Sequence, residues 1–136
     1  MRNSTNVMRA RTFLMPNGIR VNWRNIPYFT ITENKDPEGN VKYVAIIKWK
    51  YKAGLMEEVV ELGGEDFRPA VYFKQYQIVP LTKETYINLN NIMLIKEQPI
   101  PGPQERVLVK IVLIDGFQLV VKMDRERWAW WKQTYA

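Results

Sequence analysis

The chain has 136 residues, with no cysteine and no histidine. It can therefore form neither disulfides nor thiolate metal sites, and it lacks the commonest metal ligand and the usual general base near neutral pH. A net charge of +6 with 46% hydrophobic residues is typical of a globular protein that favours acidic partners such as nucleic acid. We expect no enzymatic activity and no cofactor.

The first eleven residues are polar and rich in arginine. This composition predicts a basic N-terminal arm, residues 1–11, ahead of a single domain, residues 12–136. The N-terminus has no apolar run of the kind found in signal peptides, and no stretch approaches the roughly 20 apolar residues that span a bilayer. We expect a soluble, cytoplasmic protein that does not bind membranes.

Strand signals dominate after the arm. The stretch "GIRVNWRNIPYFTITE" alternates apolar and polar residues but is interrupted around Asn25–Pro27, which predicts two short strands with a break between them. "NKDPEGN" predicts a turn, and "VKYVAIIKWKYKAG" with "LMEEVVEL" predicts a hairpin. A short helix is expected over residues 65–77, with Asp66 as its N-cap and Pro69 in its first turn.

A linker at residues 78–84 leads to a second half in which the order recurs. "TYINLNNIMLIKE" predicts another broken strand, "QPIPGPQE" a rigid loop, and "RVLVKIVLIDG" with "FQLVVKM" another hairpin. "DRERWAWWKQTY" predicts a closing helix capped by Asp124. At helical spacing Trp128, Trp131 and Tyr135 share one face, which we expect to pack on the sheet.

The two halves also share a six-residue pattern, "VNWRNI" in the first and "INLNNI" in the second. Shifting residues 19–47 by 66 positions places them on residues 85–113 without a gap and aligns both asparagines of each stretch. We therefore expect an α+β fold, mainly antiparallel β, in two pseudo-repeated β-β-β-α modules, 12–77 and 84–136, that share a core. Two unrelated β-meanders that look alike remain the alternative.

The stretch "KYVAIIKWKYK" interleaves basic and aromatic residues, as strands that bind single-stranded nucleic acid do. Strand alternation places its aromatic residues on the apolar side and its lysines on the other, where they form a basic stripe. The lysines of this stripe are Lys42, Lys48, Lys50 and Lys52. The arginines of the arm that would assist them are Arg2, Arg9 and Arg11.

Three interpretations of this stretch remain open. In the first it contacts the phosphates of DNA or RNA with little base readout, and the chain is a non-enzymatic nucleic-acid-binding protein whose binding weakens with salt. In the second it is an ordinary solvated strand face. In the third the end of the sheet exposes Trp49 and Tyr51, whose rings form a platform on which bases stack. The acidic residues of the following strand, among them Glu57 and Glu61, are expected to be solvated or to pair with these lysines rather than to act in catalysis.

The alternative function is that of a structural or assembly subunit of a virus particle or another multi-chain complex. Trp130 points away from the packed helix face, and tryptophan is enriched at protein interfaces. Pro101 and Pro103 stiffen the loop of the second half. These residues and the arm would contact neighbouring chains in a homo-oligomer or larger assembly. In a virus particle, the protein would be located in the virion. A small adaptor that docks on an acidic protein is a third possibility.

The stretch "YINLNNIMLIKE…VLIDGFQLVV" resembles in rhythm the closing strands of LytTR-type DNA-binding domains. "KQYQIVPLTKET" stands where that family has a His-Arg-Ser-type stretch. The layout of two sheet-plus-helix modules resembles the PUR-repeat and Whirly-type single-strand binders, which have more strands in each module. These resemblances imply nucleic-acid binding but assign no binding residue.

Overall fold

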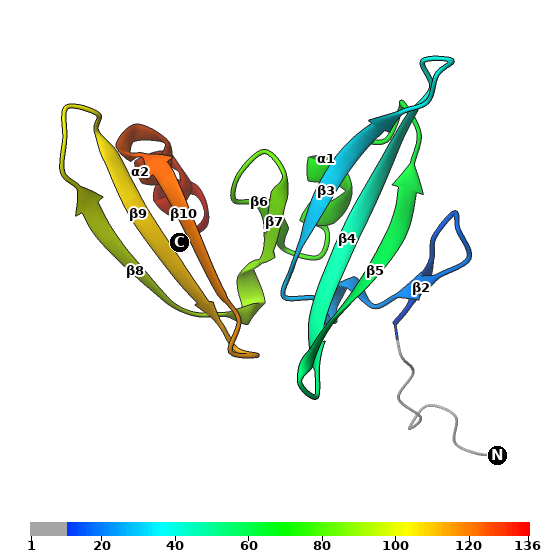
Figure 1. Ribbon diagram of the computed structural model, residues 1–136, viewed down its shortest axis with the longest axis horizontal. Helices are drawn as coiled ribbons and strands as arrows, with labels where there is room; N and C mark the ends of the chain where they lie inside the picture. Colours follow the sequence, from blue (N-terminus) through cyan, green and yellow to red (C-terminus); the bar gives the residue numbers. More distant parts are fainter. Residues whose placement is uncertain (1–10) are drawn as a thin grey trace.

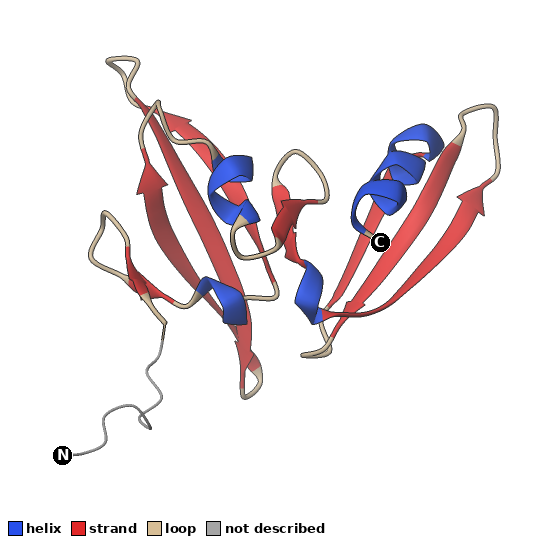
Figure 2. Ribbon diagram, turned by 180° about the vertical axis from the view of Figure 1, so that it is seen from behind, coloured by secondary structure: helices blue, strands red, loops and turns tan. Residues whose placement is uncertain are grey.

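The computed structural model describes residues 11–136. Antiparallel strands form a five-stranded sheet, a three-stranded sheet and a small two-stranded hairpin, and two short α-helices accompany the two larger sheets (Figures 1 and 2). The predicted α+β class with mainly antiparallel β structure is confirmed. No helix in this range is long and apolar enough to cross a membrane.

The five-stranded sheet combines segments from both halves of the chain. Its strands, in sequence order, are β3 (Tyr28–Lys35), β4 (Val41–Tyr51), β5 (Gly54–Gly63), β6 (Ile78–Pro80) and β7 (Thr85–Asn88). Their spatial order is β5-β4-β3-β7-β6, so the β6–β7 hairpin extends the β3–β5 meander along the edge of β3. Helix α1 (Pro69–Lys74) separates β5 from β6 in sequence.

The three-stranded sheet is a second meander. Its strands are β8 (Ile92–Ile100), β9 (Arg106–Leu113) and β10 (Gln118–Asp124), in the spatial order β10-β9-β8. Helix α2 (Arg125–Tyr135) follows β10 and packs against this sheet. Strand β8 pairs with β9 on one side only, and it forms the outer margin of the molecule at the end opposite β2 (Figure 1).

Both predicted breaks are confirmed, and each is a turn of 3-10 helix. The first, η2 (Trp23–Asn25), joins β2 (Arg20–Val21) to β3, and the second, η3 (Leu89–Asn91), joins β7 to β8. An asparagine occupies the N-cap position in each case, which suits a side chain that readily bonds its own main chain. Strand β2 pairs with β1 (Phe13–Leu14) in a hairpin that the strand pattern did not predict.

Two hydrophobic cores hold the molecule together. The first contains an aromatic cluster in which Phe73 of α1 packs edge-on against Trp23 at 4.8 Å between ring centroids and against Phe29 at 4.8 Å. In the second, Trp131 of α2 packs among the inner residues of β9, and its indole N–H donates to the carbonyl oxygen of Pro80 at 3.0 Å. Buried aromatic rings dominate both cores because each ring removes a large apolar area from water.

The β6–β7 hairpin belongs to both cores. Ile78 and Tyr86 pack into the first core, and Val79 and Ile87 pack into the second. Successive side chains of a strand point to opposite faces, so one short hairpin can serve two cores at once. Each half of the chain is therefore anchored on the other.

The helices agree with the sequence only in part. Helix α1 occupies residues 69–74 of the predicted 65–77, and Arg68 rather than Asp66 holds the N-cap position. Pro69 opens this helix, as predicted, because its missing N–H costs little there. In α2, Asp124 is the N-cap residue and both Trp128 and Trp131 are buried, which confirms the predicted packing face.

The expected linker at residues 78–84 contains strand β6 instead. Pro80 made this segment look unlike a strand, but β6 is an edge strand, where a missing backbone N–H is tolerated.

Candidate nucleic-acid interface

Strand β4 alternates as the sequence predicted. Tyr43, Ala45 and Ile47 face the first core, and Lys42 and Lys48 lie on the opposite face of the sheet. Beyond Ile47 the strand extends past the core, so the aromatic side becomes accessible. There Trp49 is 41% exposed and Tyr51 is 59% exposed.

The lysines of β4 do not form a continuous basic stripe. Buried Val44 and half-buried Ile46 lie between Lys42 and Lys48 on the same face. At the usual rise of about 3.3 Å per residue, Lys42 and Lys50 are about 26 Å apart. The β4 stripe is therefore divided into one lysine at one end of the strand and a pair at the other.

Acidic side chains of β5 accompany these lysines. The Nζ of Lys42 lies 3.7 Å from a carboxylate oxygen of Glu61, and Lys48 is directly opposite Glu57 in the β4–β5 register. Cross-strand neighbours of opposite charge compensate one another. The expected pairing of lysines with the acidic residues of β5 is confirmed for Lys42, and the net positive field of this face is reduced.

The other two lysines of the predicted set lie against aromatic rings. Lys50 has its Nζ 5.3 Å from the ring centroid of Phe117, which belongs to the β9–β10 turn. Lys52 lies in the β4–β5 turn with a positive φ of 56°, and its Nζ is 5.4 Å from the ring of Tyr51. Both contacts are cation–π interactions.

The remaining predicted site residues lie on separate elements. Arg11 is exposed at the start of the described chain, and Arg2 and Arg9 lie outside the described residues. Trp130 of α2 is 51% exposed and contacts Tyr135 edge-on, at 5.9 Å between ring centroids. The two prolines of the β8–β9 loop, Pro101 and Pro103, are also exposed.

A second group of cations meets on the outer face of the three-stranded sheet, the face turned away from α2 and the second core. Its members come from all three strands and are called here the basic face: Lys96, Arg106, Lys110 and Lys122. Lys96 of β8 lies directly opposite Lys110 of β9. Lys122 is a diagonal neighbour of Lys110, because Lys110 pairs with Val120 on the adjacent strand.

The basic face carries little compensating charge. Among its strand residues only Asp124 is acidic, and this carboxylate lies 4.0 Å from Arg106 at the far end of the sheet. Like charges placed directly opposite each other in a sheet are destabilising. The Lys96–Lys110 pair therefore costs stability in the free protein, and a bound anion would relieve that cost.

Glu97, the other acidic strand residue nearby, points to the inner face. Its carboxylate accepts a hydrogen bond from the indole N–H of Trp128 and another from Lys132 at 3.2 Å. These two contacts, the indole first, lower the pKa of Glu97 below its ordinary value. Because Glu97 is engaged with α2, it leaves the lysines of the basic face unneutralised.

The basic face is flat and partly apolar. Leu94, Leu108 and Val120 lie among its cations, and a shallow depression is lined by Lys96, Glu97, Gln98, Leu108 and Lys110. No aromatic residue belongs to this face, so it offers no platform for base stacking. The arrangement suits contact with phosphates and sugars rather than the reading of bases.

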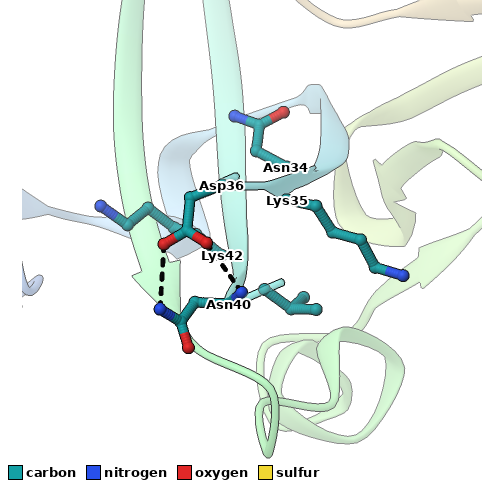
Figure 3. Close-up of a pocket in the computed structure, with 6 residues that line it drawn as sticks. Asn34, Lys35, Asp36, Asn40 and Lys42 are labelled. Atoms are coloured by element: carbon teal, nitrogen blue, oxygen red, sulfur yellow. Dashed lines mark hydrogen bonds between the residues drawn. The ribbon is translucent and has the colours of Figure 1, made fainter. Parts of the chain in front are cut away.

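A different depression lies at the tip of the β3–β4 hairpin, where Asn34, Lys35 and Lys42 surround the turn (Figure 3). The carboxylate of Asp36 accepts hydrogen bonds from the backbone N–H of Asn40 at 2.8 Å and from its side-chain amide at 3.0 Å. These bonds lower the pKa of Asp36. Its oxygens are thus occupied in shaping the turn.

Metal-ligating clusters are absent from the part of the chain that the structure describes: residues 11–136 contain no group of three or more acidic side chains that could hold an ion. Glu57 and Glu61, which the sequence offered as a carboxylate pair, lie on one face of β5. Glu61 is paired with Lys42.

The sequence alone showed the lysines and arginine of the basic face but not their proximity. Each strand taken singly contributes only one or two cations, and the β4 segment, with four lysines, is far richer. The register of β8 on β9 and of β9 on β10 is what assembles the basic face. Alternation within each strand was the available signal, but it needed the pairing partner as well.

Comparison with known protein families, with curated protein sequences and with solved structures found no match to this chain. The resemblances in strand rhythm described above therefore transfer no function and no residue role.

Proposed function

We propose that the chain is a non-enzymatic nucleic-acid-binding protein that contacts phosphates through the basic face, with mainly sequence-independent affinity. The observation that carries the proposal is the placement of Lys96 directly opposite Lys110, with Lys122 diagonal to them and no acidic side chain among the three. A polyanion would stabilise such a cluster. DNA and RNA are both candidates, because the contacts involve phosphates and sugars.

The test compares two variants with the same change in net charge. Lys110→Gln/Lys122→Gln removes two cations of the basic face, and Lys42→Gln/Lys48→Gln removes two from the β4 stripe. We expect wild-type binding to duplex DNA to fall steeply between about 50 and 200 mM salt. The first variant should lower the slope of log K against log salt by about 2, and the second should leave it nearly unchanged.

Three results would contradict the proposal. Absence of any salt-sensitive retention of DNA or RNA would remove nucleic acid as the partner. Loss of binding in the β4 variant alone would assign the phosphate contact to Lys42 and Lys48, the surface expected from the sequence. Equal loss in both variants would indicate attraction by net charge alone, without a defined surface.

We also propose that the two halves are copies of one module. Each half runs hairpin, 3-10 turn, three-stranded meander, helix. The hairpins support this proposal most directly, because corresponding pairs are separated by 66 positions, the same shift that aligns the sequences. The corresponding pairs are Phe13–Val21 with Val79–Ile87, and Leu14–Arg20 with Pro80–Tyr86.

Backbone hydrogen bonds repeat at the same interval. The N–H of Met15 donates to the carbonyl of Ile19 at 2.8 Å, and the N–H of Leu81 donates to that of Thr85 at 2.8 Å. The residue that follows each 3-10 turn likewise bonds back to the first residue of that turn. Two unrelated hairpins would have no reason to share these registers, although the β8–β9 pairing is offset by two residues from the register that the same shift of the β3–β4 pairing would give.

The second candidate function is that of an assembly subunit. One observation favours it: within the described part of the chain no strand pairs with the outer edge of β8, while the equivalent edge of β3 is covered by the β6–β7 hairpin. A free strand edge is a template for pairing with another chain.

A further inference from the structure

The chain contains one interface at which a hairpin of one module adds to the sheet edge of the other. Strand β7 adds to the edge of β3 in antiparallel register, with Phe29 opposite Tyr86. The pairing is extended at both ends: the N–H of Asn88 donates to the carbonyl of Pro27 at 2.9 Å, and the N–H of Ile31 donates to that of Glu84 at 2.8 Å. The β6–β7 hairpin of the second half thus completes the sheet of the first.

The corresponding sheet edge and the corresponding hairpin of the two modules do not pair with each other in the described chain. The edge of β8 corresponds to the covered edge of β3, and the β1–β2 hairpin corresponds to the β6–β7 hairpin. They cannot meet within one chain, because β8 and β2 lie at opposite ends of the long axis of the molecule (Figure 1). A second copy of the chain, however, can supply a β1–β2 hairpin to the β8 edge and a β8 edge to the β1–β2 hairpin.

We propose that the protein self-assembles head to tail, with the β1–β2 hairpin of one copy added to the β8 edge of the next. A shift of 66 positions from the internal example gives the intermolecular register: Leu94 opposite Val21, Ile95 opposite Arg20, and Lys96 opposite Ile19. The three-stranded sheet then becomes β10-β9-β8-β2-β1, the same order as β5-β4-β3-β7-β6. This proposal rests on the module correspondence above and is independent of nucleic-acid binding.

The side chains of the β1–β2 hairpin fit this role. Met15 and Val21 are buried in the core of their own module, as Leu81 and Ile87 are in theirs. The opposite side of the hairpin is uncovered, with Leu14 61% exposed and Arg20 also exposed. In the second hairpin the residue that corresponds to Arg20 packs into the core of the other module.

An asparagine gives independent support. In the internal interface the side-chain amide of Asn88 donates to the carbonyl oxygens of Arg24 at 3.0 Å and Ile26 at 3.4 Å, and its Oδ1 accepts from the N–H of Asn90. Asn22 is its counterpart, but among residues 11–136 the buried Oδ1 of Asn22 has no hydrogen-bond partner and its 3-10 turn has no side-chain cap. The carbonyls of a second copy would hold this amide in the capping orientation.

Charge also favours the contact. With Arg20 opposite Ile95, the diagonal neighbour on the same face of β8 is Glu97. Its carboxylate is already paired with Lys132, but the side chain is still 45% exposed and can accept a further cation. Diagonal cross-strand neighbours lie about 7–8 Å apart, within reach of an arginine side chain. The interface joins different surfaces of the two copies, so it generates a ring if the rotation closes and a filament if it does not.

The decisive experiment is cysteine crosslinking, since the natural chain has no cysteine. The pair Ile19→Cys and Lys96→Cys corresponds to Thr85 opposite Thr30 of the internal interface, and directly opposed residues are close enough for a disulfide. Mixing the two single variants under mild oxidation should give the mixed dimer, and one chain with both changes should give a ladder of multimers. The control pair Ile19→Cys and Lys122→Cys, two strands further away, should not crosslink.

Two substitutions test the interface without a crosslink, by sedimentation after nuclease treatment over a range of protein concentrations. Arg20→Glu should weaken association about tenfold by opposing Glu97, whereas Lys35→Glu on the exposed β3–β4 hairpin should not. Asn22→Asp keeps an oxygen that could cap η2, but it loses the amide donor that would reach the carbonyls of the second copy. It should weaken association while leaving the unfolding midpoint unchanged or raised.

A species that stays monomeric at every concentration, with no disulfide between positions 19 and 96, would overturn the proposal. Crosslinking of the control pair at an equal rate would overturn it as well, and so would association that neither Arg20→Glu nor Asn22→Asp weakens. None of these results bears on the nucleic-acid proposal, whose test uses Lys110 and Lys122 and measures retention of DNA.

Discussion

The side-chain amide of Asn88 donates to the carbonyl oxygen of Arg24, 64 positions earlier in the chain, at 3.0 Å. Asn88 is fully buried, and the same side chain caps the 3-10 turn η3 through its Oδ1. One amide therefore satisfies backbone groups of both halves at the point where β7 meets the end of η2. This hydrogen bond stabilises the pairing of β7 with β3, by which the second half completes the sheet of the first.

Replacing Asn88 with alanine should strongly destabilise the protein. The change leaves two carbonyl oxygens and one N–H in a part-buried setting without their partner, and we expect a loss of about 2–3 kcal/mol in the free energy of unfolding. Urea denaturation followed by tryptophan fluorescence measures it. The same substitution at exposed Asn90, whose side chain makes no such contact, should cost less than about 0.5 kcal/mol, and an equal loss at both positions would contradict the assigned role.

The two neighbouring tryptophans of α2 should respond very differently to substitution. Trp131→Phe removes a fully buried indole and its hydrogen bond to Pro80, so we expect a loss of about 1–3 kcal/mol. Trp130→Phe changes a half-exposed ring and should cost little. Thermal unfolding of the two variants gives the comparison, and a larger effect at Trp130 would show that α2 packs through a different face.

Stability should depend on pH through Glu97. Its pKa is lowered in the folded protein, mainly by the hydrogen bond from Trp128 and then by Lys132. A carboxylate of this kind contributes stability above its ordinary pKa of 4.5, and the contribution is lost as pH falls through the lowered value.

We therefore expect Glu97→Gln to reduce stability at pH 7, by less than about 1 kcal/mol because the group is largely solvated. The difference from the wild type should disappear once the pH lies below the lowered pKa of Glu97. Glu105→Gln, on the exposed β8–β9 loop, serves as the control. A difference for Glu97→Gln that persists at low pH would assign its effect to packing rather than to charge.

The basic face should show a conflict between stability and binding. Lys110→Glu converts a repulsive pair with Lys96 into an attractive one, and we expect stability at low salt to rise by about 0.5 kcal/mol. The same change should abolish most of the salt-dependent binding of DNA. Differential scanning calorimetry in low and high salt, together with a binding isotherm, tests both effects. A destabilised variant would show that the two lysines are not close enough to repel.

The local features of the fold could be predicted from the sequence because they depend on neighbouring residues. Alternation placed Tyr43, Ala45 and Ile47 on the core side of β4, and helical spacing placed Trp128 and Trp131 on the packed face of α2. Both breaks near asparagine were predicted from turn chemistry. These patterns repeat within a few residues, so backbone geometry alone determines which side chains share a face.

Only the tertiary structure decided which strands pair and therefore which charges meet. The β4 stripe looked like the basic surface, yet the β4–β5 register sets Lys48 opposite Glu57, and the β8–β9 register sets Lys96 opposite Lys110. The pairing of β7 with β3 could not be predicted from the sequence either. Strand pairing joins residues far apart in the chain through backbone hydrogen bonds that are the same for every side chain, so the partner is chosen by the packing of the whole molecule.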